Sequence, residues 1–215
     1  MSLLPPATAM MVSRSVTAQT LPVERLMVSH SSEAKVVVLG AGGWGCALAV
    51  ALCGENDVTI WSPFEEEIDH LRQFRGNDKL LPGVRIPEKV LFTTSLDCVR
   101  TCDLVMMVVP SVAVRETARK LSGILPAGAV VVDAAKGIEL STTKLMCECI
   151  EEELPSCRSA VLSGPSHAEE VARGVPTTVV AAARDQDLMA AGDAAQQQIL
   201  FQVQLAQGTP VAALF

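Results

Sequence analysis

The 215-residue sequence predicts an α/β domain, with a doubly wound, mostly parallel sheet and helices on both faces. Short, mostly β-branched apolar runs alternate with helix-like segments along the chain. Hydrophobic residues make up 49% of the sequence and aromatic residues only 3%, so Val, Leu, Ile and Ala must build the core. Because strands covered by helices on both faces read as continuous apolar runs, these observations together favour this fold class.

Each element is predicted from its pattern and its flanking residues. The expected strands are residues 35–40, 57–61, 90–94, 103–109, 129–134, 159–163 and 177–183. The expected helices are residues 43–54, 64–74, 112–122, 141–153, 166–173 and 186–200. Ser111 and Ser141 are the expected N-caps of two helices, and Ser166 with Glu169 is the expected capping box of a third. Residues 75–90, rich in proline and glycine, are predicted to form a loop near the functional site.

Charge and cysteine usage exclude several classes of protein. The formal net charge is −7 without a long lysine or arginine run, which argues against a general nucleic-acid surface. Uninterrupted apolar stretches are too short for a membrane span. The seven cysteines follow no disulfide-framework spacing, and no histidine lies near the closest pairs, so we expect no metal site.

A glycine cluster separates the first expected strand from the first expected helix. Gly40-Ala41-Gly42-Gly43-Trp44-Gly45 fits the pattern G-x-G-x-x-G in the strand-to-helix context that supports it. Gly40 permits the tight turn, Gly42 lets the backbone approach a pyrophosphate, and Gly45 lets the helix pack closely on the strand. The helix N-terminus offers amides and a positive dipole end to that anion. The motif predicts a Rossmann-type fold that binds NAD or NADP.

The second expected strand leaves the choice between NAD and NADP open. An acidic residue at its end would read the adenosine ribose, but the sequence there is Trp61-Ser62-Pro63-Phe64. The acids Glu65–Glu67 follow, and we assign them to the first turn of the next helix.

Other polar residues follow apolar strands, where open α/β sheets bind ligands. Pro110-Ser111 follows one strand and Lys136-Gly137 follows the next. A lysine in this position is costly to bury without an anion or an acceptor. Gly164 and Ser166 precede a further helix start and offer more donors.

Five stretches, in this order and spacing, resemble NAD(P)-dependent glycerol-3-phosphate dehydrogenases: GAGGWGCALA, NDKLLPG, VVPS, AAKGIE and SGPSHAEEVARGVPT. The resemblance covers about residues 35–203 and implies interconversion of dihydroxyacetone phosphate and sn-glycerol 3-phosphate. With the glycine motif, it implies these cofactor-binding residues: Gly40, Gly42, Gly43, Trp44, Gly45, Pro63, Phe64, Pro110, Lys136 and Ala168. It also implies substrate contacts from Lys136, Gly164 and Ser166, and Lys136 is the expected catalytic residue, orienting the substrate.

The chain departs from the family pattern at two places. His167 stands where the family has Phe, which we interpret as a tolerated substitution. The family continues into an all-helical domain with a G-A-x-K-N motif, whose lysine transfers the proton, and an arginine that holds the phosphate. Neither is present in the sequence, so we expect weak or no turnover by this chain alone.

The expected organisation follows from these boundaries. Residues 1–33 form a disordered or transit-peptide-like extension, residues 34–203 the dinucleotide-binding domain, and residues 204–215 a divergent tail where the helical substrate domain would begin. The expected location is cytoplasmic, or organellar (plastid or mitochondrion) if the extension is a transit peptide.

Two alternatives stay open. One is a non-catalytic NAD(P)-binding module that partners a full-length homologue. For either kind of chain, the expected protein partner is a second copy in a homodimer or a full-length homologue. The other is a related 3-hydroxyacid or ketopantoate-type dehydrogenase, which the NDKLLPG and SGPSHAEEVARG stretches disfavour.

Overall fold

The computed structural model describes residues 34–164, 166–175 and 179–183. The predictions for residues 1–33, 186–200 and 204–215 lie outside these described residues. One sheet has the strand order β3-β2-β1-β4-β5-β6-β7, parallel throughout except for β7, which pairs antiparallel with β6. The strands are β1 Ala34–Leu39, β2 Asn56–Trp61, β3 Leu91–Thr93, β4 Leu104–Met107, β5 Val130–Asp133, β6 Arg158–Ser163 and β7 Val180–Ala183. The predicted doubly wound, mostly parallel sheet is confirmed.

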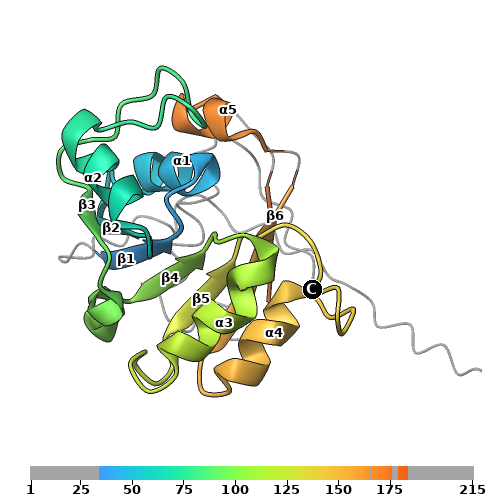
Figure 1. The fold of residues 1–215 in the computed structure, drawn as a ribbon. Coiled ribbons are helices and arrows are strands. Elements are labelled where there is room, and N and C mark those ends of the chain that lie inside the picture. The colour runs from blue at the N-terminus through green and yellow to red at the C-terminus, as the bar shows by residue number, and fades with distance from the viewer. Residues whose placement is uncertain (1–33, 165, 176–178, 184–215) are drawn as a thin grey trace, which may run out of the picture.

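Helices cover both faces of this sheet. They are α1 Gly43–Leu52, α2 Glu65–Phe74, α3 Ser111–Leu121, α4 Met146–Glu153 and α5 Ala168–Ala172. Helices α1, α2 and α5 lie on one face, and α3 and α4 lie on the other (Figure 1). Strand order reverses between β1 and β4, so the crevice at their carboxyl ends is the expected ligand site of such a fold.

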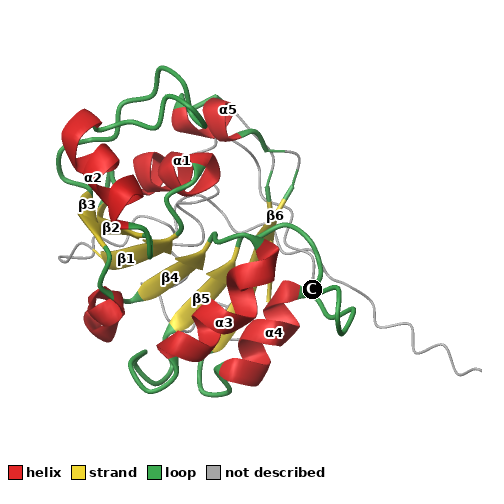
Figure 2. Cartoon of the chain, viewed as in Figure 1, coloured by secondary structure: helices red, strands yellow, loops and turns green. Residues whose placement is uncertain are grey.

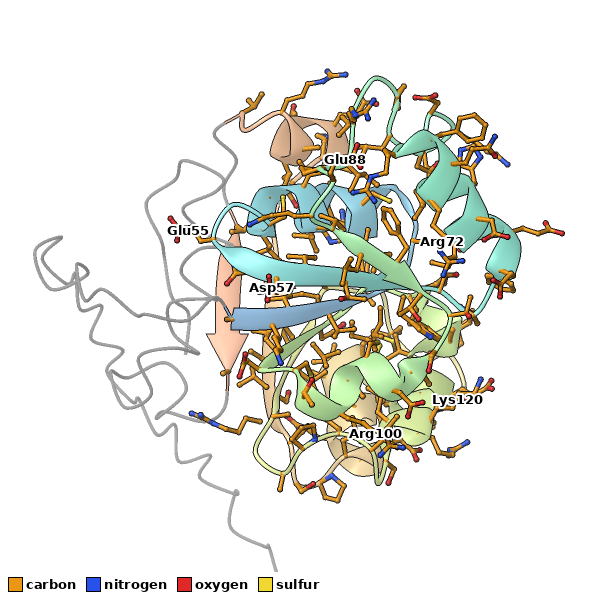
Figure 3. All side chains as sticks on the ribbon, turned by 90° about the vertical axis from the view of Figure 1, so that its left-hand side faces the viewer. Glu55, Asp57, Arg72, Glu88, Arg100 and Lys120 are labelled. Carbon is orange, nitrogen blue, oxygen red and sulfur yellow. The ribbon has the colours of Figure 1, made fainter. Side chains whose placement is uncertain are left out.

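The core consists of two apolar layers separated by the sheet. Alternate residues of β1 point to opposite faces, with Val36 and Val38 packing in the α1 layer and Val37 and Leu39 in the α3–α4 layer. Figure 3 shows the sheet between these layers, with Glu88 on one side and Lys120 on the other. Burial on both faces explains the continuous apolar runs in the sequence.

Three predicted helix starts are wrong. Ser111 is the first residue of α3, and its N-cap is Pro110. Ser141 lies in a turn, and α4 begins at Met146, where the Glu148 carboxylate accepts the Leu145 N–H at 2.9 Å. The Ser166–Glu169 capping box does not form, because the N-cap of α5 is His167, without a side-chain cap.

Backbone contacts in the segments before α4 and α5 explain why these two helices begin later than predicted. Residues 138–145 fold back on themselves, since Ile138 pairs with Leu145 and the Glu139 N–H donates to the Lys144 carbonyl at 2.9 Å. The chain therefore reaches helical geometry later than expected. At Ser166, the backbone N–H donates to the Gly164 carbonyl at 2.9 Å, two residues before α5 begins.

A short 3₁₀ helix, η2 Leu96–Thr101, was not predicted. Its N-cap is Ser95, whose hydroxyl accepts the Asp97 N–H at 3.2 Å. Figure 2 shows how this and the other helices lie outside the sheet, with loops at both of its ends.

The loop of residues 75–90 packs against the glycine turn. Arg75 ends α2 in the left-handed region (φ 52°), and its guanidinium donates to the Val90 carbonyl at 3.0 Å. The same guanidinium lies 4.7 Å from the centre of the Phe92 ring. Within the loop, Asn77 Nδ2 donates to the Ala41 carbonyl at 3.1 Å. The Asn77 hydrogen bond holds the loop beside the start of α1, and the Arg75 contacts tie the two ends of the loop together.

Candidate functional site

The protein's own packing requires three of the four glycines in the turn. Gly40 has a φ of +129°, and a Cβ there would lie 2.9 Å from the Val108 carbonyl oxygen. A Cβ at Gly43 would lie 2.4 Å from the Leu80 carbonyl oxygen, and one at Gly45 only 2.0 Å from that of Gly40. Real Cβ atoms do not approach backbone this closely, so these positions exclude any side chain.

Gly42 is different, because nothing in the fold excludes a side chain there. Its φ of −69° and ψ of 177° suit any residue, and no atom lies within 4 Å of an added Cβ. Gly42 is also exposed. A side chain at Gly42 would therefore fill only the open space in front of the turn.

The N-terminus of α1 carries no acidic residue of its own. Gly42 is its N-cap, and its first turn contains no acidic residue, whereas the first turn of α2 has Glu65, Glu66 and Glu67. The first amides of a helix have no acceptor inside the helix. Free amides beside open space fit the pyrophosphate of a dinucleotide.

The last residue of β2, where an acidic side chain usually binds the ribose, is Trp61. Ser62 is buried, donates to Glu67 Oε2 at 2.6 Å and accepts the Phe64 N–H at 3.3 Å. Pro63 and Phe64 are exposed, and Phe64 is 62% accessible. The assignment of Glu65–Glu67 to the first turn of α2 is confirmed.

A cavity of about 370 Å³ brings together four of the predicted site residues. Trp44 from the first turn of α1, Lys136 after β5, and Gly164 and Ser166 after β6 all line it. They meet because the carboxyl ends of parallel strands lie at one edge of the sheet.

The other predicted residues lie elsewhere. Pro63 and Phe64 do not line this cavity, and Pro110 caps α3. Ala168 lines a second cavity of about 440 Å³ beside α5, together with Leu80 and His167.

Lys136 is exposed and lies at the start of the loop that connects β5 to α4. It has no hydrogen bond or ion pair with any residue in the described ranges. The next residue, Gly137, has a φ of +119°, and a Cβ there would lie 3.4 Å from Ser111 Oγ on α3. The Lys136 ammonium is thus placed at the cavity with its charge available to an anion.

Asp133 also lines this cavity and was not among the predicted site residues. It is the last residue of β5, is only 4% exposed, and accepts the Ala135 N–H on Oδ1 at 3.0 Å. Burial raises the pKa of this carboxyl to about 6, although the Ala135 hydrogen bond acts in the opposite direction. An acid at the end of the apolar run VVVD was the available signal. A buried carboxyl with a perturbed pKa in a cavity is a candidate functional group.

The described ranges contain no helix long and apolar enough to cross a membrane. The same residues include no group of three or more His, Cys, Asp or Glu side chains that could hold a metal ion.

Curated relatives resemble about 71% of this chain. The glycerol-3-phosphate dehydrogenase [NAD(P)+] of Moorella thermoacetica is 49% identical over 154 residues, which is 71% of this chain and 46% of the relative. The enzyme of the same name from Agathobacter rectalis is 42% identical over 154 residues, again 71% and 46%. The chain therefore spans about half the length of the curated relatives it matches.

Solved structures and a family model also show similarity to glycerol-3-phosphate dehydrogenases. The glycerol-3-phosphate dehydrogenase from Coxiella burnetii superposes with a TM-score of 0.72 at 27% identity, covering 84% of this chain and 53% of that one. A prephenate dehydrogenase from A. aeolicus superposes at 0.60 and 18% identity, covering 87% of this chain and 61% of that one, and shares the fold alone. The family model described as NAD-dependent glycerol-3-phosphate dehydrogenase N-terminus matches residues 35–189. The glycine turn, the strand-end lysine and the sheet order thus occur in a chain that belongs to this family.

Proposed function

We propose that this chain binds NAD or NADP through the glycine turn and provides the cofactor side of a glycerol-3-phosphate dehydrogenase. The observation that carries the proposal is the bare backbone at Gly42. Packing accounts for Gly40, Gly43 and Gly45 but places no atom near a Cβ at Gly42. A glycine that the fold does not need is explained by a ligand that approaches the backbone.

Different residues of the chain would bind different parts of the dinucleotide. The amides at the start of α1 would hold the pyrophosphate, and Trp44 would line the cavity beside it. Pro63 and Phe64, exposed after β2, would pack against the adenosine, and Pro110 would border the crevice after β4. The bound nicotinamide supplies or accepts a hydride.

We propose dihydroxyacetone phosphate and sn-glycerol 3-phosphate as the substrates, in line with the names of the relatives. The unpaired Lys136 ammonium would contact the bound cofactor, attract the anionic substrate and stabilise negative charge on the substrate oxygens. The Ser166 hydroxyl and the backbone around Gly164, which line the same cavity, would add hydrogen bonds. Asp133 would shape the turn to Lys136 by accepting the Ala135 N–H.

Titration with NADH and with NADPH, followed by the fluorescence of Trp44 and Trp61, tests the proposal. We expect a saturable change with at least one of the two cofactors. A turnover assay with dihydroxyacetone phosphate, run on the same preparation, separates an active dehydrogenase from a non-catalytic binding module. If neither cofactor changes the fluorescence or is retained in equilibrium dialysis, the proposed function is wrong.

Replacing Lys136 with alanine should weaken NADH binding about tenfold, because a charged hydrogen bond to a ligand contributes roughly 1.5–3 kcal/mol. The dissociation constant from the fluorescence titration measures this effect. Lys120→Ala is the matched control, since Lys120 lies on α3 and pairs with Glu116 at 2.8 Å. Equal losses in both variants would mean that only the net charge matters.

A further inference from the structure

We propose that Arg115 of α3 is a positioning residue, which acts through Glu139 to hold the loop that carries Lys136. This inference rests on the proposed function, because it assigns Arg115 a role in the binding that Lys136 performs. Arg115 itself does not line the Lys136 cavity.

Arg115 and Glu139 form a bidentate ion pair. Arg115 Nε lies 2.7 Å from Glu139 Oε1, and Arg115 Nη2 lies 2.9 Å from Glu139 Oε2. Both side chains are largely buried, with 22% and 18% of their surfaces exposed. Hydrogen bonds from Arg115 and Thr142 lower the pKa of Glu139 to about 2. A planar fork on a carboxylate fixes direction as well as distance, which an ammonium cannot do.

Glu139 lies three residues after Lys136, in a loop that is closed on itself. The Thr143 N–H donates to the Glu139 carbonyl at 2.7 Å, and the Glu139 N–H donates to the Lys144 carbonyl at 2.9 Å. The Glu139 backbone and side chain are therefore fixed together. Holding its carboxylate also holds the short segment between Glu139 and Lys136.

Helix α3 meets this loop at two points on one face. Ser111 lies against Gly137, directly after the lysine, and Arg115 binds Glu139, directly before the closed turn. Ser111 and Arg115 are four residues apart, so they project from the same side of the helix. The segment 137–139 is thus fixed at both ends relative to α3, and Lys136 immediately precedes it.

Arg115 also joins α3 to α4. An experiment must separate this second role from the contact with Glu139. It binds Glu152 at 2.8 Å and Glu153 at 3.0 Å. Arg119, one turn further along α3, binds Glu153 at 2.8 Å. Both arginines tie α3 to α4, but only Arg115 has an ion pair with Glu139. Arg119 is therefore a matched control for the α3–α4 contact alone.

A double-mutant cycle on NADH binding tests the inference. The full chain is compared as wild type, Arg115→Lys, Lys136→Ala and the double variant, with Arg119→Lys as control. We expect Arg115→Lys to raise the dissociation constant about fivefold and Lys136→Ala about tenfold, with the double variant no weaker than Lys136→Ala alone. Arg119→Lys should change it less than about twofold. Glu139→Gln should repeat the effect of Arg115→Lys if that variant does not fold.

The possible results separate the inference from the function on which it rests. If Arg115→Lys weakens binding by the same factor with and without Lys136, Arg115 acts independently and the inference is overturned. If NADH binds the wild type and Lys136→Ala has no effect, there is no lysine contact to position, and the inference is likewise overturned. If the wild type does not bind NADH, the proposed function itself fails, and the inference falls with it.

Discussion

Alanine in place of Gly45 is expected to destabilise the domain by about 3 kcal/mol or more. The added Cβ would lie 2.0 Å from the Gly40 carbonyl oxygen and 3.0 Å from its carbon. These are backbone atoms between β1 and α1, so no side-chain rotation can relieve the overlap. Urea denaturation followed by circular dichroism measures the change as a lower midpoint, or as loss of the folded baseline.

Gly54→Ala is the control for this experiment. No atom lies within 4 Å of a Cβ at Gly54, just after α1, so its midpoint should stay close to that of the wild type. A wild-type midpoint for Gly45→Ala would show that β1 and α1 do not approach as closely as described.

Asparagine in place of Asp133 is expected to stabilise the domain at neutral pH by about 2–3 kcal/mol. Burial raises the pKa of Asp133 from an ordinary 3.8 to about 6, so the folded state binds its proton more tightly than the unfolded state does. In the wild type, the stability that comes from the protonated carboxyl is fully present below pH 4 and is lost as the pH rises through 6. Asparagine keeps an acceptor for the Ala135 N–H and carries no charge, so it avoids this loss.

The pH dependence makes this prediction specific. The difference between Asp133→Asn and the wild type should be near zero at about pH 4, grow up to about pH 6, and stay constant above it. Thermal unfolding at several pH values measures it. Asp57→Asn, at an exposed position on β2 (Figure 3), removes the same charge and should give a small difference at every pH. A stabilisation by Asp133→Asn that does not vary with pH would contradict the account.

The sequence predicted the fold well because its signals are local. Apolar runs and the glycine turn depend on neighbouring residues, so the strands and the start of α1 at Gly43 were placed within a few residues. The start of α4 was placed at residue 141 because Ser141 is a good N-cap in isolation. The structure begins α4 at Met146, because residues 138–145 fold back on themselves; Glu139 in this segment also pairs with Arg115, 24 residues earlier in the chain.

The candidate site was likewise predicted where the sequence signal is local and missed where it depends on contacts between distant residues. Trp44, Lys136, Gly164 and Ser166 share a cavity because parallel strands end at one edge, which the alternating pattern implied. Asp133 was missed because its burial, which leaves only 4% of the residue exposed, depends on the folded structure and not on neighbouring residues. The different reasons for the four glycines could not be separated either, because they depend on Leu80 and Val108.

The most direct test of the account is an NADH titration of Gly42→Val beside the wild type. Valine should fold with a stability within about 1 kcal/mol of the wild type, because nothing lies near its Cβ and Gly42 makes no side-chain cap. We expect the same variant to bind NADH at least about a hundredfold more weakly, since the side chain fills the space that the pyrophosphate needs. A folded Gly42→Val protein that binds NADH as tightly as the wild type would contradict the claim that this bare backbone holds the cofactor.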